Sequence, residues 1–488
     1  MSAPESPPLL SPVAAAGLIA GLAALAVTLA LPAPAGLPAT GWRVLGLGLL
    51  MAIWWSTEPV PVGITALLPP ILLPMLGAGG IGAVTAPYAN PLTFLFLGGF
   101  LLAAAVERWG LHRRLAHAVV RAMGTEPRRL VLGFMLAAAG LSMWISNTAA
   151  VVLMLPVAVS VVTAVEAARG RDAEGARFAQ ALLLGLAYGA SIGGVGTLIG
   201  TPPNALLAAW LRESHGIDLS FAAWASVGMP LVAVFLPLAW LSLTRVTHRV
   251  GPEFGARLAA GGVLAGLAPE GPRSAAERRV GLVFAIAAGL WIARPVLNEI
   301  PGLEALSDPG IALGAAAALF LIPAGGGERR FLLSWAEAKG INWQVLILFG
   351  GGLSLASAME AHGLAAWIAE GLSGFAGLPP FGFLMLVAAA VTLLTALASN
   401  TATVAALLPV AGTLAGASGL DVAALGAAVA MAASCAFLLP VSTPPNALVF
   451  GSGHVSVASM VRGGAALNVL AVLLVAAAAW LVAPALGR

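Results

Sequence analysis

Two polar triplets with the sequence Ser-Asn-Thr interrupt long apolar stretches of this chain. They comprise Ser146, Asn147 and Thr148 in the first stretch, and Ser399, Asn400 and Thr401 in the second. Side-chain oxygens of these residue types cap a new helix by accepting from its free N–H groups. Each triplet therefore predicts a break, at which one helix ends in free carbonyls and another begins with free N–H groups. Carbonyl and hydroxyl oxygens suit a hard cation such as Na+, whereas N–H groups at a helix start favour an anion.

A second pair of motifs, Thr-Pro-Pro-Asn, begins at Thr201–Pro202 and at Thr443–Pro444. Consecutive prolines remove two backbone donors and push the preceding residue out of helix, so each motif predicts another break. Broken helices persist in lipid only where they line a cavity or are buried by protein. One polar triplet alone could simply join helices by hydrogen bonds, but two mirrored copies beside prolines favour four breaks around one cavity.

Composition places these motifs in a lipid bilayer. With 60% hydrophobic and 9% charged residues, the chain has too little polar surface for a water-soluble globule. Eleven apolar runs predict spans near 13–31, 41–56, 58–78, 91–107, 180–208, 220–243, 280–298, 306–323, 344–360, 422–450 and 464–485. Two further apolar tracts, 130–165 and 380–412, carry the triplets. The single cysteine, Cys435, excludes an intramolecular disulfide and a cysteine metal cluster.

The basic residues predict the topology. All but one of the 23 are arginines, gathered in a few loops that the positive-inside rule assigns to the cytoplasm, together with the N-terminus. Tract 130–165 has basic loops at both ends and so must enter and leave on the same side. The flanks of tract 380–412 contain no lysine or arginine. Both tracts are predicted to be re-entrant helical hairpins of opposite orientation, since two ordinary spans need about 40 residues. Because the loops account for the positive charge, we expect no nucleic-acid partner.

The two halves of the chain repeat in the same order. Glu107 and Ser146 recur 253 positions later as Glu360 and Ser399, and the Thr-Pro-Pro-Asn motifs lie 242 positions apart. An odd number of spans separates the matched segments, which predicts an inverted repeat of the kind found in secondary transporters. The predicted organisation is a tail with the first span (1–40), a first repeat (41–243), a cytoplasmic loop (244–279) and a second repeat (280–488).

Neither hairpin contains Asp, Glu, Lys, Arg or His. An anion held there would be balanced by helix dipoles and co-bound cations, which favours Na+ over protons as the coupling ion. An intramembrane enzyme would need a nucleophile and a base within the bilayer, and an anion channel would need a basic pore ring. The sequence predicts neither of these, and no cofactor besides the coupling ion.

Together these motifs resemble the divalent anion/sodium symporter family of dicarboxylate, citrate and sulfate carriers. The resemblance covers nearly the whole chain and rests on both motif pairs, WWSTEPVPVGITALLP at 54–69 and SCAFLLPVSTPPNALVFGSG at 434–453. It implies an all-α polytopic membrane protein with about 11 spans and two re-entrant hairpins. It also implies a homodimer in the plasma membrane that imports a C4-dicarboxylate such as succinate with Na+ by an elevator motion. A Na+-independent dicarboxylate exchanger is the alternative, and sulfate or citrate is less favoured.

The resemblance further implies which residues bind. One Na+ site would use Ser142, Ser146, Asn147 and carbonyls near Gly200, and its mirror Thr395, Ser399, Asn400 and carbonyls near Ser442. The expected substrate-binding residues are Ser146, Asn147, Thr148, Thr201, Pro202, Ser399, Asn400, Thr401, Thr443 and Pro444. Ser442 departs from the family pattern, which has Ala or Gly there. Its added hydroxyl could assist the cation or alter the fit of the substrate.

Overall fold

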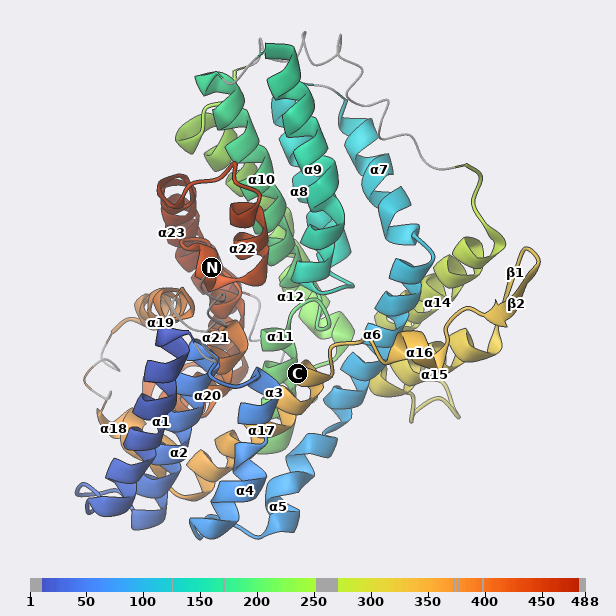
Figure 1. The fold of residues 1–488 in the computed structure, drawn as a ribbon. Helices are drawn as coiled ribbons and strands as arrows, with labels where there is room; N and C mark the ends of the chain where they lie inside the picture. Colours follow the sequence, from blue (N-terminus) through green and yellow to red (C-terminus); the bar gives the residue numbers. More distant parts are fainter. Residues whose placement is uncertain are drawn as a thin grey trace, which may run out of the picture.

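The chain folds almost entirely into α-helices (Figure 1). The structure is a computed structural model that describes residues 11–124, 126–169, 172–251, 271–371, 374, 378–396 and 399–481. Its first half contains α1 Pro12–Ala30, α2 Ala39–Thr57, α3 Val62–Thr65, α4 Leu68–Met75, α5 Ile81–Thr85, η1 Ala86–Ala89, α6 Pro91–Arg108, α7 Leu111–Met123, α8 Pro127–Ser142, α9 Asn147–Arg169, α10 Ala173–Gly194, α11 Pro202–His215, α12 Phe221–Leu241 and η2 Ser242–Thr247.

The second half has the same helical character. It contains α14 Ala275–Leu297, α15 Asp308–Leu321, β1 Pro323–Gly325, β2 Glu328–Phe331, α16 Trp335–Ala338, α17 Trp343–Ala361, α18 Leu364–Gly371, α19 Pro380–Thr395, α20 Asn400–Ser418, α21 Val422–Ala433, η6 Pro440–Ser442, α22 Pro444–Gly451 and α23 Val457–Leu481. The antiparallel β1–β2 ribbon projects from the helical body in Figure 1. It was not predicted from the sequence.

Seven described helical segments are long and apolar enough to cross a membrane, and five further apolar segments are shorter. Several spans are short because they are broken: 180–208 is divided into α10 and α11, and 422–450 into α21 and α22. Both divisions fall at the predicted Thr-Pro-Pro-Asn breaks. Span 58–78 is also divided, into α3 and α4, which the sequence analysis did not foresee. The fold class is nevertheless the predicted one, an all-α polytopic membrane protein.

Both polar tracts form pairs of helices. In the first, α8 packs against α9 and both pack against α10, as Figure 1 shows. In the second, α19 packs against α20, whose end at Ser418 lies beyond the predicted limit of the hairpin. The breaks predicted at the two Ser-Asn-Thr triplets are therefore confirmed. Residues 397–398, just before the second triplet, lie outside the described residues.

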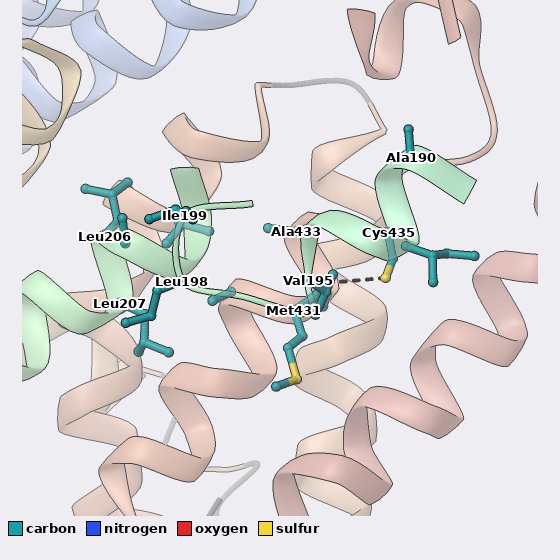
Figure 2. Packing of buried hydrophobic residues seen from close by; sticks show 14 of the residues in the cluster. Ala190, Val195, Leu198, Ile199, Leu206, Leu207, Met431, Ala433 and Cys435 are labelled. Atoms are coloured by element: carbon teal, nitrogen blue, oxygen red, sulfur yellow. Dashed lines mark hydrogen bonds between the residues drawn. The ribbon is translucent and has the colours of Figure 1, made fainter. Parts of the chain in front are cut away.

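Helices of each half pack against helices of the other half. Helix α11 of the first half packs against α20 and α21 of the second, and α22 of the second half packs against α9 and α10 of the first. Figure 2 shows the result in the interior, where Val195, just after α10, lies beside Met431 and Ala433 of α21 and Cys435 just after it. Each helix that begins with Pro-Pro-Asn thus contacts the hairpin of the opposite half.

Two other predicted boundaries are corrected. The last long helix begins at Val457, before the predicted start at 464, because Ser456 accepts from the N–H of Ser459 and caps it. Helix α14 begins at Ala275 within the predicted loop 244–279, where Ser274 and Glu277 form a capping box. Residues 252–270 of that loop lie outside the described residues.

Candidate functional site

The first triplet lies where α8 gives way to α9. The fully buried Ser142, the last residue of α8, donates its hydroxyl hydrogen to Oδ1 of Asn147, the first residue of α9. Ser146 accepts a hydrogen bond of 3.2 Å from the N–H of Ala149, which is the predicted cap. The structure therefore brings Ser142 into contact with Asn147, two of the side chains expected at the first cation site. Ser146 lies just before α9 and Thr148 in its first turn.

The break between α10 and α11 supplies backbone oxygens to the same place. A Cβ on Gly194 would lie 2.5 Å from Oδ1 of Asn147, so only glycine allows this side chain to approach the backbone. A Cβ on Gly200 would lie 2.5 Å from the carbonyl oxygen of Gly194 and 2.9 Å from that of Ser142. The carbonyl oxygens of Gly194 and Ser142 and the Thr197 hydroxyl thus lie near Gly200, and oxygens of this kind suit an alkali cation.

The second triplet has matching geometry. The buried Thr395, at the end of α19, donates its hydroxyl hydrogen toward Oδ1 of Asn400 at 2.6 Å, and the same hydroxyl lies 2.9 Å from the carbonyl oxygen of Ala433. Thr401 is buried in the first turn of α20. Ser399 precedes this helix but makes no capping hydrogen bond, so the cap predicted there is wrong. The pair formed by Ser142 and Asn147 is nevertheless reproduced by Thr395 and Asn400.

An asparagine that the sequence analysis did not select holds the first break in shape. Asn204, the last residue of the first Thr-Pro-Pro-Asn motif, is completely buried. Its Nδ2 donates to the carbonyl oxygens of Gly194 at 3.1 Å, Val195 at 3.5 Å and Thr197 at 2.8 Å. These carbonyls belong to the segment that wraps around the candidate cation site. Asn204 therefore fixes the direction of oxygens left free where α10 ends.

The second half repeats this arrangement at the equivalent positions. Nδ2 of the completely buried Asn446 donates to the carbonyl oxygens of Ala436 and Leu439, at 3.1 Å each. Ala436 and Leu439 lie 242 positions after Gly194 and Thr197, as Asn446 does after Asn204. Two equivalent amide–carbonyl contacts thus recur in the two halves. The repetition of the Thr-Pro-Pro-Asn motif could have marked both asparagines as important. Only the three-dimensional path of the chain after each helix shows which carbonyl oxygens the amide reaches.

A hydroxyl ties the first hairpin tip to its neighbouring break. Thr197 donates to the carbonyl oxygen of Met143, the residue after α8, and accepts from the N–H of Gly200 at 3.1 Å. In the second half Ser442 donates to the carbonyl oxygen of Ala396 at 2.9 Å and accepts from the N–H of Leu439 at 3.3 Å. The Ser442 hydroxyl, expected to assist the cation or alter substrate fit, also anchors the hairpin tip.

The remaining predicted residues lie at the starts of α11 and α22. Thr201 and Thr443 are buried and extended, each immediately before a helix that begins with Pro202 or Pro444. Thr443 caps its helix by accepting from the N–H of Asn446 at 3.2 Å, whereas Thr201 makes no such side-chain contact. Since α22 packs against α9 and α11 against α20, both starts belong to helices that contact the opposite hairpin.

The site is built without ionised side chains. The hairpin tracts and both adjoining segments, 191–204 and 433–446, contain no Asp, Glu, Lys, Arg or His. Among the described residues no group of three or more His, Cys, Asp or Glu side chains could hold a metal. An anion held at this place would therefore have to be balanced by backbone dipoles and by co-bound cations.

Comparison with known proteins assigns the chain to a family. A family model described as the sodium:sulfate symporter transmembrane region matches residues 13–486. The chain belongs to the sodium:sulfate symporter family. This confirms the resemblance stated from the motifs, and makes the protein an integral membrane transporter and not an enzyme.

Relatives of this sodium:sulfate symporter family member are similar along nearly their whole length. The chain is 39% identical over 480 residues to the sodium-dependent dicarboxylate transporter SdcS of Staphylococcus saprophyticus, covering 96% of this chain and 92% of the relative. It is 38% identical over 475 residues to SdcS of Staphylococcus aureus strain USA300, covering 96% and 91%.

Two solved transporters share the fold at low sequence identity. The YdaH transporter of Alcanivorax borkumensis superposes with a TM-score of 0.58 at 16% identity, covering 92% of this chain and 100% of the other. MtrF of Neisseria gonorrhoeae gives a TM-score of 0.56 at 14% identity, covering 96% and 94%. These matches show that the symporter family member has the fold of other membrane transporters.

Proposed function

We propose that this protein imports a C4-dicarboxylate such as succinate together with Na+. The observation that carries the proposal is the pair of equivalent, uncharged breaks, in which hydroxyl, amide and carbonyl oxygens gather. Oxygen ligands of this kind suit Na+, and the free N–H groups at the starts of α9 and α20 suit carboxylates. The dicarboxylate and sodium in the name of the SdcS relatives favour the same pairing of solute and ion.

In the proposed site, one Na+ lies among Ser142, Ser146, Asn147 and carbonyls near Gly200. The second lies among Thr395, Ser399, Asn400 and carbonyls near Ser442. The substrate lies between the triplets, contacting Ser146, Asn147, Thr148, Ser399, Asn400 and Thr401, with Thr201, Pro202, Thr443 and Pro444 closing the pocket. Cations on either side of a dianion offset the missing basic side chains.

The proposed movement follows from the inverted repeat. The first repeat (41–243) and the second (280–488) have opposite orientations, so one hairpin opens to the cytoplasm and the other to the outside. The protein works as a homodimer in the plasma membrane with its N-terminus in the cytoplasm. The hairpin-bearing part moves like an elevator and exposes the same site to each side in turn.

Uptake into proteoliposomes tests the coupling. A dianion that enters against an inside-negative potential is opposed by about 2.3 kcal/mol per charge per 100 mV. Two Na+ ions neutralise the dianion, and a third makes uptake electrogenic. Labelled succinate should therefore accumulate only with external Na+, with inward current, and not when choline or K+ replaces Na+.

The same measurement separates the alternative, a Na+-independent exchanger. An exchanger would take up labelled succinate without Na+ whenever the vesicles contain unlabelled succinate, and would show no net uptake into empty vesicles. Full uptake in Na+-free buffer with no internal counter-substrate would overturn the symporter. Parallel assays with sulfate and citrate compare the less favoured solutes directly.

A further inference from the structure

An apolar cavity of about 260 Å³ borders the first hairpin. Its lining includes Leu136 and Gly140 of α8, Trp144 at the hairpin tip and Phe284 of α14. The Trp144 and Phe284 rings meet edge to face, with centroids 4.8 Å apart. An apolar cavity of about 150 Å³ already accepts a benzene-sized guest, so this one has room for part of a hydrocarbon chain.

The cavity reaches the surface of the described structure. Leu136, one of its lining residues, is 38% exposed, and Gly140 is also exposed. A Cβ added at Gly140 would meet nothing within 4 Å, so the space beside this residue is open. In a membrane protein, an apolar cavity with such an opening is accessible to lipid.

Helix α7 covers another side of the cavity and is strongly amphipathic. Leu111 and Val119 contribute to the lining, whereas Arg113 and Arg121 are exposed on the polar face. Neither arginine side chain makes a hydrogen bond or an ion pair with another described residue. The acidic side chain that faces α7 from α14, Glu277, is already bonded to Arg114 at 2.6 and 3.2 Å. An interfacial helix with free arginines and an apolar opposite face is typical of binding to anionic lipid.

We propose that the cavity and α7 together bind one anionic phospholipid. Its acyl chain lies in the cavity against Trp144, and its phosphate lies at Arg113 and Arg121. Trp144 is separated from Ser146 of the polar break by one residue, so the bound chain contacts the hairpin tip beside the first triplet. The lipid is therefore placed to restrain the tip, and its binding does not depend on the identity of the transported solute.

Photocrosslinking tests this site. The full-length protein is reconstituted in phosphatidylcholine vesicles containing a small fraction of phosphatidylglycerol with a diazirine near the end of one acyl chain. After irradiation, the label should appear in the segment 130–169, which carries Leu136, Gly140 and Trp144. The same diazirine on phosphatidylcholine should label this segment far less.

Two variants examine the two parts of the site. Gly140→Leu fills the cavity and should remove the label, whereas Gly289→Leu, on an exposed part of α14 with equally open space, should leave it unchanged. Combined Arg113→Gln and Arg121→Gln changes should lower the preference for the anionic lipid about 25-fold, or about fivefold per arginine. Because this double variant alters only exposed side chains, it remains informative if Gly140→Leu does not fold.

Either of two results would overturn the proposal. Equal labelling of 130–169 by the two lipids would mean ordinary contact with surrounding lipid. Persistence of the label in a folded Gly140→Leu protein, with an unchanged melting temperature, would mean that the chain does not occupy the cavity.

Discussion

The two hairpin breaks differ most clearly in the hydroxyl that anchors each tip. In the first half, Thr197 donates to the carbonyl oxygen of Met143, and Gly200 only supplies an N–H. In the second half, the position equivalent to Thr197 is Leu439 and that equivalent to Gly200 is Ser442, and Ser442 makes the bond. The hydroxyl thus lies three residues further along the chain in the second half, but it still donates to a carbonyl oxygen at the hairpin tip.

The surroundings of the two breaks also differ. Residues 191–201 are buried throughout, in a segment rich in glycine. The equivalent second segment becomes partly exposed after Phe437, and Val441 is 81% exposed. The comparison teaches that the two halves preserve the hydrogen bonds that direct their backbone carbonyl oxygens. They do not preserve the residues at each position or the extent to which the segment is buried.

The largest expected difference is the side from which each hairpin is reached. In a protein whose Cys435 is replaced by alanine, Ala122→Cys tests the approach to the first hairpin and Gly416→Cys the end of the second. A membrane-impermeant thiol reagent added outside right-side-out vesicles should label Gly416→Cys and leave Ala122→Cys unlabelled until the membrane is permeabilised. Labelling of both from outside would place the hairpins on one side and remove the inverted repeat.

Loss of the triplet asparagine in either half should strongly reduce transport. Asn147→Ala and Asn400→Ala each remove an amide from the proposed substrate site, and one hydrogen bond to a charged group is worth roughly 1.5–3 kcal/mol. Succinate uptake at low substrate should fall about tenfold to a hundredfold. Asn298→Ala, on the loop after α14, is a matched control that should retain uptake. Normal uptake by one triplet variant would mean that the halves do not share one site.

Loss of Asn204 or Asn446 should weaken Na+ binding more than substrate binding. Asn204→Ala and Asn446→Ala release carbonyls that the amide now directs, so the Na+ concentration for half-maximal uptake should rise about tenfold. The KM for succinate at saturating Na+ should change less, and selectivity for Na+ over Li+ should weaken. A purely structural role predicts instead a lower yield of folded protein with unchanged Na+ dependence and ion selectivity.

Removal of the hydroxyl that anchors each hairpin tip, at Thr197 or Ser442, should have the smallest effect on uptake. Thr197→Val and Ser442→Ala each remove the hydrogen bond donated to the hairpin tip, together with the one that the hydroxyl accepts from a backbone N–H. Loss of the neutral bond to the tip, worth about 1 kcal/mol, should raise the half-maximal Na+ concentration about fivefold. Transferring the first-half arrangement into the second, by Leu439→Thr with Ser442→Gly, should restore much of the loss in Ser442→Gly alone. A double variant no better than the single one would show that the two positions are not interchangeable.

Much of the candidate site could be predicted because its signals in the sequence are local. The polar triplets and prolines stand out in apolar sequence, and their repetition locates both hairpins and both adjoining breaks. The prolines within 58–78 carried a similar signal, but apolar length alone made that segment look like one span. Prolines end a helix only where the freed backbone groups find other partners, and that depends on the surrounding fold.

The contacts of Asn204, Asn446, Thr197 and Ser442 could not be predicted from sequence. Which carbonyl an amide or hydroxyl reaches depends on how the chain turns after the helix ends. The first half carries its hydroxyl at Thr197, whereas the second half carries it at Ser442 and has Leu439 at the position equivalent to Thr197. When the two halves are aligned residue by residue, these positions therefore look unrelated. Only the geometry shows that the same bond is made from the neighbouring position.

The absence of Asp, Glu, Lys, Arg and His from both hairpins and their adjoining segments has a consequence for acidity. No group that forms the proposed site can gain or lose a proton between mildly acidic and mildly alkaline conditions. The only titrating partner in the complex is then the dicarboxylic acid itself. As the medium is acidified, uptake should follow the shrinking fraction of the dianion: the apparent KM for total solute rises while the maximal rate holds. The pH dependence of the apparent KM would therefore be set by the pKa values of the transported acid, and an acid with different pKa values would shift it along the pH axis.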